Sequence, residues 1–193
     1  YWWMDAGWYI QQKGWPQVGT WEIDPKRFPR GFKPISDHAH AKGLKTLVWF
    51  EPERVAAGSM IAREHPEFVF GAEKGGLFKL NEPEARRWLT ELLSKRIAEY
   101  GVDIYRHDFN IDPLDFWRKA DAADRQGITE IRHITGYLAY WDELRRRHPE
   151  MLIDSCASGG RRNDLETLRR AVPLLRSDYI FEPVGEQNHT YGI

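Results

Sequence analysis

The chain has 193 residues, of which 41% are hydrophobic and 30% charged, as expected for a globular domain with a sizeable core. Its formal net charge of -1 gives no electrostatic footprint for nucleic acid or for an anionic membrane surface. No apolar run is long enough to cross a membrane, and a single cysteine excludes an internal disulfide framework, which favours a cytoplasmic location and leaves secretion open.

The first half of the chain predicts strands and helices in alternation. Residues 1–4 predict a strand that starts inside an apolar run, so we interpret the chain as a piece of a longer protein. A helix is expected at 32–42, with Pro34 in its first turn and Gly43 at its end, and a strand at 44–50 follows. We then expect a short helix near 56–64, a loop through Gly75 and Gly76, and a long helix at 83–100 that ends at Gly101.

The second half continues this pattern. A strand is expected at 102–106, followed by a loop that contains Pro113 and Gly127. A helix at 128–147 is predicted from apolar residues at a spacing close to 3.6, namely Ile131, Ile134, Leu138, Trp141 and Leu144. Strands near 151–155 and 172–176 complete the series.

This alternation predicts an α/β fold built from βαβ units with a parallel sheet. A closed (β/α)8 TIM barrel needs roughly 250 residues, so the chain should supply about five of its eight strand–helix units. A doubly wound sheet is the alternative, but no glycine-rich nucleotide loop follows the first strand. We therefore expect residues 1–193 to be a fragment of one catalytic barrel domain without an internal domain boundary.

Carboxylates and a glycine-rich turn come directly after the predicted strands. Asp108 follows the strand at 102–106, Asp178 follows the strand at 172–176, and the turn at 156–160 follows the strand between them. A barrel builds its active site at these strand ends, so the two aspartates are predicted to form an acid/base pair that acts on a sugar. The neighbouring Arg106 favours the ionised form of Asp108. From spacing alone, either aspartate could instead cap a helix or pair with a buried cation.

Three linked motifs resemble those of the glycoside hydrolase family 36 α-galactosidases. They are Trp-Phe-Glu-Pro-Glu at 49–53, Arg-His-Asp-Phe-Asn at 106–110, and Cys-Ala-Ser-Gly-Gly at 156–160 with Arg162 and Asp164 after it. In that family a Lys-Trp-Asp-Met-Asn segment carries the nucleophile, and a later Ser-Asp carries the acid/base. The order is kept from Asp5 to Tyr191 and Gly192, over nearly the whole chain.

The resemblance implies a role for each matching residue. Asp108 would be the nucleophile and Asp178 the acid/base of a retaining mechanism. Asp5, Trp49 and Asn110 would line the sugar pocket, and Arg106 takes the place of the family's substrate-binding lysine. The turn that meets the sugar's 2-position would be formed by Cys156, Ser158 and Gly159, where the absence of a Cβ lets backbone N–H groups approach a ligand. Neither a metal nor a cofactor is implied.

Departures from the family pattern affect the expected substrate. The family's first strand ends Asp-Asp-Gly-Trp, whereas this chain has Ala6 as the second residue, and Arg106 is not interchangeable with lysine. We expect exo-acting hydrolysis of terminal α-galactosides in an oligosaccharide or glycoside. The alternatives are an altered sugar preference, such as an α-N-acetylgalactosaminide, galactosyl transfer as in raffinose synthases, and a non-catalytic sugar-binding module. The full-length protein could form a homo-oligomer.

Other residues have competing interpretations. Trp8 and Trp49 directly follow strand-like runs and are interpreted as sugar platforms, whereas most of the other tryptophans are expected to pack in the core. Glu51 and Glu53 could rival Asp178 as the acid, but their position beside an apolar strand favours structural, hydrogen-bonded carboxylates. Cys156 is expected to be a pocket-lining thiol and not a nucleophile.

Overall fold

The computed structural model describes residues 1–185 and 187, so Tyr191 and Gly192 lie outside the described part. Its strands are β1 (Trp2–Met4), β2 (Thr46–Phe50), β3 (Arg54–Val55), β4 (Val69–Phe70), β5 (Gly76–Phe78), β6 (Ile104–His107) and β7 (Leu152–Ser155). Its α-helices are α1 (Lys33–Ala41), α2 (Met60–Glu64), α3 (Pro83–Tyr100), α4 (Leu114–Ala120), α5 (Ile128–Arg147) and α6 (Leu165–Leu168). Single 3-10 turns are η1 (Pro66–Phe68), η2 (Ala72–Lys74) and η3 (Asp178–Phe181).

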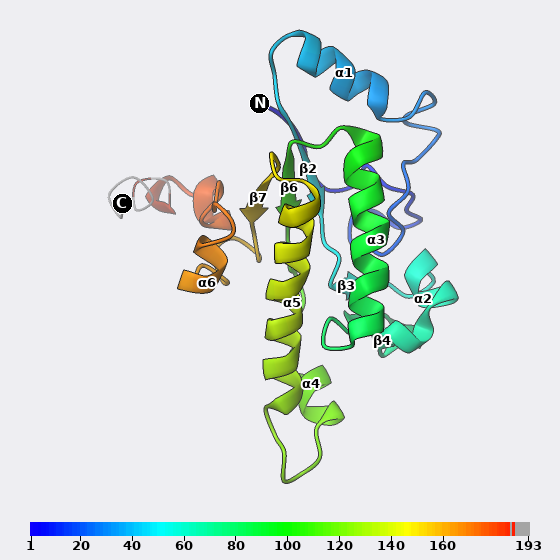
Figure 1. Cartoon of the computed structure of the whole chain (residues 1–193), viewed down its shortest axis with the longest axis vertical. Coiled ribbons are helices and arrows are strands. Elements are labelled where there is room, and N and C mark those ends of the chain that lie inside the picture. Colours follow the sequence, from blue (N-terminus) through cyan, green and yellow to red (C-terminus); the bar gives the residue numbers. More distant parts are fainter. Residues whose placement is uncertain (186, 188–193) are drawn as a thin grey trace.

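The centre of the fold is a four-stranded parallel sheet in the order β1-β2-β6-β7. The strands follow one another in chain order, with α1, α3 and α5 on the connections, and α3 packs against α5 (Figure 1). Every residue of β2 and β6 is buried, as expected for parallel strands covered on both faces. A doubly wound sheet would reverse its strand order at a switch point, whereas this order is that of successive units of a barrel.

The predicted fifth strand at 172–176 is wrong, because only Val172 pairs with the sheet, through a parallel bridge to Asp154. The next residue, Pro173, has no N–H group and cannot continue the ladder. The Leu174 amide then donates to the side chain of Asp154 (2.9 Å) and not to the main chain of β7. The segment therefore leaves the sheet after one residue.

Between β2 and α3 the chain forms a small antiparallel sheet, β3-β5-β4, where a loop was expected. Helix α2 is shorter than predicted because Ser59 caps it, accepting from the Ala62 amide, so the helix begins only at Met60. The predicted loop after β6 also contains α4. These elements have two to seven residues, too few to show a hydrophobic period.

Helix α5 has the predicted bounds, but its buried face differs from the predicted one. Trp141 and Leu144 are buried as expected, whereas Ile131 and Ile134 are exposed. The N-terminal half of the helix instead buries His133 and Tyr137. His133 donates to a buried carboxylate, so a polar contact and not an apolar stripe decides which side of α5 faces inward. None of the described helices is long and apolar enough to cross a membrane.

Candidate active site

Residues from three chain segments meet around the carboxylate of Asp108, which follows β6. Trp49 of β2 donates its indole N–H to Oδ2 (3.0 Å), and the Asn110 amide donates to the same oxygen (2.8 Å). The backbone N–H groups of Phe109 (2.7 Å) and Ser158 (3.1 Å) donate to Oδ1. Asp108 is only 8% exposed, so these four donors determine the orientation of a nearly buried anion.

This environment favours the ionised form of Asp108. Burial alone would raise its pKa, but hydrogen bonds from Asn110, Cys156, the Phe109 amide and Trp49 outweigh burial and hold the pKa below its ordinary value. A carboxylate with several N–H donors and a low pKa is ready to act as a nucleophile near neutral pH. An ionised Asp108 has no proton to give to a leaving group, so a second group must supply that proton.

The turn after β7 brings Asp178 to the same end of the sheet. Ser158 has φ 47° and Gly159 has φ +82°, so the chain reverses sharply after Cys156. A Cβ on Gly159 would lie 2.8 Å from the Ser177 Cα and 2.9 Å from the Asp178 nitrogen. We expected the missing Cβ of Gly159 to leave room for a ligand, whereas in the structure the backbone of Ser177 and Asp178 occupies that space. The same turn therefore contacts Asp108 through Ser158 and Asp178 through Gly159.

Asp178 is exposed and begins the 3-10 turn η3, so it does not sit at the end of a regular strand as predicted. Desolvation of its carboxylate raises its pKa even though the residue as a whole is exposed, and repulsion from Asp108 adds to this shift. Arg106 acts in the opposite direction. The two aspartates thus interact electrostatically, and their pKa values are displaced in opposite directions, which is the condition for one to attack and the other to hold a proton.

The contact at Gly159 gives a testable consequence. In the full-length protein, Gly159→Ala should lower the kcat/KM of the reaction expected from the Asp108–Asp178 pair by about 10-fold or more, because Asp178 must move away from the added methyl group. Gly43→Ala is the matched control, since that glycine also has a positive φ (+71°) but has nothing within 4 Å of the added Cβ. Equal activity losses in the two variants would show that backbone strain, and not the contact with Asp178, is responsible.

The predicted substrate-binding residue Arg106 is 3% exposed and contacts four groups of the protein itself. Its Nη1 donates to Asp154 (2.5 Å) and its Nη2 donates to the sulfur of Cys156 (3.2 Å). The guanidinium also lies over the Trp3 ring, 4.9 Å from its centroid, and 3.6 Å from the carboxylate of Asp5. Asp5 is half exposed, so it is more accessible to a sugar than Arg106 is.

Cys156 is buried, and its surroundings oppose ionisation. Desolvation, followed by the negative charge of Asp108, raises the pKa of the thiol to about 12. A protonated, buried thiol is a poor nucleophile, and the role of Cys156 as a lining residue stays a prediction.

The prediction that Trp8 is a sugar platform is wrong. Its ring is fully buried and packs edge-on against Tyr9, Phe50 and Tyr100, and its N–H donates to the Trp49 carbonyl (2.8 Å). The ring of Trp49 is also buried, stacked on Tyr9 with centroids 6.1 Å apart. Trp49 therefore reaches the site through its indole N–H and does not offer an open face.

A buried polar cluster behind Asp108 was not predicted as a unit. Glu53 is fully buried and accepts from His107 Nε2 (2.9 Å), His133 Nε2 (2.7 Å) and Arg162 Nη1 (2.7 Å). His107 Nδ1 in turn accepts from the Trp141 indole (2.7 Å). Burial would raise the pKa of Glu53, but Arg162 and the two histidines hold it well below its ordinary value. Glu53 is thus a structural carboxylate. Glu51 is also fully buried and accepts from Arg54 and from the backbone N–H of Asn110, and burial raises its pKa.

We expect Glu53→Gln to destabilise the full-length protein by about 3–5 kcal/mol, because the new amide turns a donor toward groups that need an acceptor. Urea unfolding followed by tryptophan fluorescence measures this loss. Glu99→Gln is the control, because Glu99 pairs with Arg96 at the surface and should contribute below about 1 kcal/mol. Similar losses in both variants would contradict a structural role for the buried cluster.

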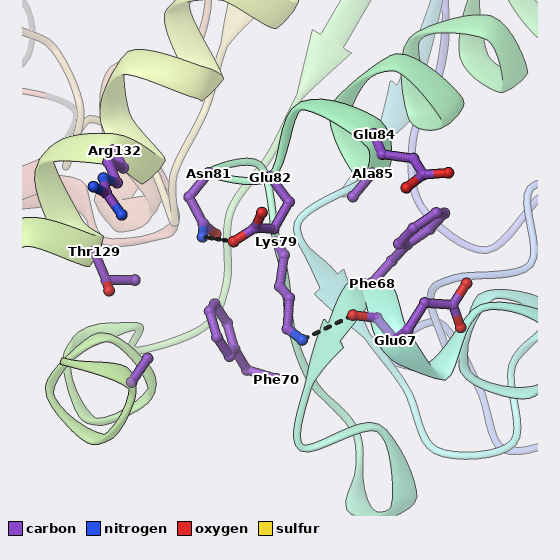
Figure 2. Close-up of a pocket in the computed structure, with 11 residues that line it drawn as sticks. Glu67, Phe68, Phe70, Lys79, Asn81, Glu82, Glu84, Ala85, Thr129 and Arg132 are labelled. Atoms are coloured by element: carbon purple, nitrogen blue, oxygen red, sulfur yellow. Dashed lines mark hydrogen bonds between the residues drawn. The ribbon is translucent and has the colours of Figure 1, made fainter. Parts of the chain in front are cut away.

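An open pocket of about 480 Å³ lies away from these residues, between η1, β4, the segment after β5 and the starts of α3 and α5 (Figure 2). Lys79 crosses it, donating to the Glu67 carbonyl (2.8 Å) and lying 5.0 Å from the centroid of the Phe70 ring. None of the predicted site residues lines this pocket. Among residues 1–185 and 187, no three His, Cys, Asp or Glu side chains are placed to hold a metal ion.

Comparisons with known proteins identify relatives along nearly the whole chain. The family model described as Melibiase matches residues 1–187. The chain is 28% identical over 171 residues to the α-galactosidase Mel36A of Lactobacillus acidophilus, covering 84% of this chain and 23% of that protein. It is also 28% identical over 188 residues to an Escherichia coli α-galactosidase, covering 91% of this chain and 25% of that protein. The chain thus spans about a quarter of the length of these relatives.

Solved structures agree with this result at the level of the fold. An α-galactosidase from Lactobacillus brevis superposes with a TM-score of 0.84 at 25% identity, covering 98% of this chain and 27% of that one. The GH36 α-galactosidase AgaA of Geobacillus stearothermophilus gives a TM-score of 0.84 at 22% identity, covering 98% of this chain and 28% of that one. The described strands and helices are therefore part of a (β/α)8 barrel of this type.

Proposed function

The chain belongs to the melibiase family, and on this basis we propose that the full-length protein is a retaining glycoside hydrolase that removes terminal α-galactosyl groups. The observation that carries the proposal is the pair Asp108 and Asp178. Both residues contact the turn at 156–160, Asp108 through Ser158 and Asp178 through Gly159, and their pKa values are displaced in opposite directions. We further propose that the whole chain lies within one catalytic barrel domain.

In the proposed reaction, Asp108 attacks the anomeric carbon while the bond from that carbon to the leaving oxygen breaks. Asp178 gives its proton to the leaving oxygen, so the aglycone departs as a neutral alcohol. The product of this step is a galactosyl ester of Asp108. Asp178, now ionised, takes a proton from water, and the resulting hydroxide equivalent displaces Asp108. Two inversions give net retention.

Several features support an oligosaccharide substrate. The named relatives are α-galactosidases, and variants of AgaA were crystallised in complex with stachyose and with raffinose. Asn110 and Ser158 contact the proposed nucleophile, and Asp5 lies 3.6 Å from Arg106. All three carry the polar groups that sugar hydroxyls require. Altered sugar preference, galactosyl transfer and a non-catalytic module remain the alternatives, and the presence of both aspartates weighs against the last of these.

Activity of the full-length protein on a panel of 4-nitrophenyl α- and β-glycosides tests this proposal. We expect release of 4-nitrophenol from the α-galactoside above all other substrates, with the α-anomer of galactose appearing first in proton NMR. Preference for α-N-acetylgalactosaminide would support the altered-sugar alternative. First appearance of the β-anomer would contradict the retaining mechanism, and absence of turnover on every glycoside would favour a binding module.

A further inference from the structure

Asp154 connects Arg106 with the segment that leads to Asp178, although no sequence motif assigned it a role. It lies in β7, fully buried, directly opposite Arg106 of β6 in the parallel register. Its Oδ2 accepts from Arg106 Nη1, and its Oδ1 accepts from the Leu174 amide (2.9 Å). One carboxylate therefore holds both the cation beside the nucleophile and the segment that leads to Asp178.

The charge on this pair matters because Arg106 lies among several acids. It is 3.6 Å from Asp5, and it lowers the pKa of Asp178. Burial works against the charge of Arg106, but the negative groups around it, Asp154 first among them, outweigh this effect and raise the pKa of the guanidinium. The charged groups that act most strongly on Asp178 are Asp108, Arg106, Asp5 and Arg161. Arg106 lies in β6, Asp108 and Asp5 directly follow β6 and β1, and Arg161 lies in the turn after β7.

We propose that Asp154 is a positioning residue that sets the protonation and the placement of Asp178 through its two separate hydrogen bonds. This role rests on the proposed function. Through Oδ2, Asp154 neutralises Arg106 and limits how strongly that cation stabilises ionised Asp178. Through Oδ1, it anchors the chain at Leu174, where Pro173 has ended the sheet pairing and no ladder hydrogen bond is left to do so. Asp154 need not touch the sugar for either effect.

The test is Asp154→Asn in the full-length protein, with the pH dependence of kcat/KM on 4-nitrophenyl α-galactoside as the readout. Asparagine can still accept from the Leu174 amide, but it removes the charge that balances Arg106. The unbalanced cation then stabilises ionised Asp178, so the pKa of Asp178 falls and the alkaline limb of the profile moves to lower pH. We expect a shift of about 0.5–1 pH unit, as a charge several ångströms away produces in a partly exposed site.

Asp103→Asn is the matched control. Asp103 also joins neighbouring strands through its side chain, accepting from the Thr46 amide (2.7 Å), but it precedes β6 and lies at the opposite end of the sheet. It should lower the unfolding midpoint without moving the pH profile. Arg106→Lys combined with Asp154→Glu keeps the charge pair with a shorter cation and a longer anion, and should restore the alkaline limb toward its original position.

An unmoved profile in Asp154→Asn, with wild-type protein active, would overturn the inference. Infrared titration of the carboxyl bands, with Asp178 assigned through Asp178→Asn, gives the same comparison without turnover. A lowered pKa of Asp178 in Asp154→Asn supports the role of Asp154 even if no tested glycoside is cleaved. An inactive wild-type protein would count against the proposed hydrolase alone.

Discussion

Replacement of Asp108 by alanine or asparagine in the full-length protein should reduce kcat on every α-galactoside by on the order of 10^4-fold or more. Without the carboxylate no galactosyl ester forms, and no other described carboxylate can take its place. Glu51 and Glu53, the nearest candidates, are fully buried and committed to hydrogen bonds with Arg54, His107 and His133. The loss should be the same for activated and unactivated leaving groups, because both require the nucleophile.

Asp112→Asn is the control for this variant. Asp112 lies four residues farther along the same loop, and its side chain is 98% exposed. We expect its substitution to leave kcat within about 2-fold of wild type, as for an exposed carboxylate whose ion pair with Arg161 is at the surface. A large loss in Asp112→Asn, or a small one in Asp108→Asn, would contradict the assignment of the nucleophile.

Replacement of Asp178 by alanine should divide substrates according to their leaving groups. Turnover of raffinose, whose leaving oxygen needs a proton, should fall by about 10^2–10^4-fold, the usual contribution of a general acid. Formation of the galactosyl ester from 2,4-dinitrophenyl α-galactoside should change far less, since that leaving group departs without a proton. Azide should then accelerate turnover and give α-galactosyl azide, because it attacks the ester without base assistance.

The raised pKa of Asp178 predicts how the activity depends on pH. The acid must be protonated, so kcat/KM on raffinose should fall as the pH rises through the pKa of Asp178 and as it falls through the lowered pKa of Asp108. In Asp178→Ala the alkaline limb should disappear and the acidic limb should remain. The exposed Glu182→Gln, four residues beyond Asp178, should keep both limbs. Retention of the alkaline limb in Asp178→Ala would assign the acid to another group.

Local signals in the sequence were sufficient for the long elements of the fold. Pro83 and Gly101 mark the two ends of α3, and Gly101 has the positive φ (66°) expected of a residue that ends a helix. The small antiparallel sheet was not predicted because its strands of two or three residues show no alternation. The strand predicted at 172–176 was inferred from its apolar residues alone. Pro173, which cannot continue a ladder of hydrogen bonds, argued against it.

In the site, too, short motifs could be predicted from the sequence, whereas contacts between distant segments could not. Asp108, Asn110 and Ser158 lie in short motifs, and the structure brings all three together. The partners of Arg106 and Glu53 depend on the register between strands and on which face of α5 turns inward. Arg106 meets Asp154, 48 residues away, only because β6 and β7 pair in that register. Adjacency in the sequence does not determine such pairings.

The most direct test of the central claim is to trap the ester on Asp108. Full-length Asp178→Ala protein should accumulate the intermediate when mixed with 2,4-dinitrophenyl α-galactoside, because formation of the ester is spared and its hydrolysis lacks a base. After acid quenching and peptic digestion, mass spectrometry should find one galactosyl unit on the peptide that contains Asp108, located on that residue by fragmentation. Galactosyl on a different carboxylate, or burst release of dinitrophenol with no labelled peptide, would contradict Asp108 as the nucleophile.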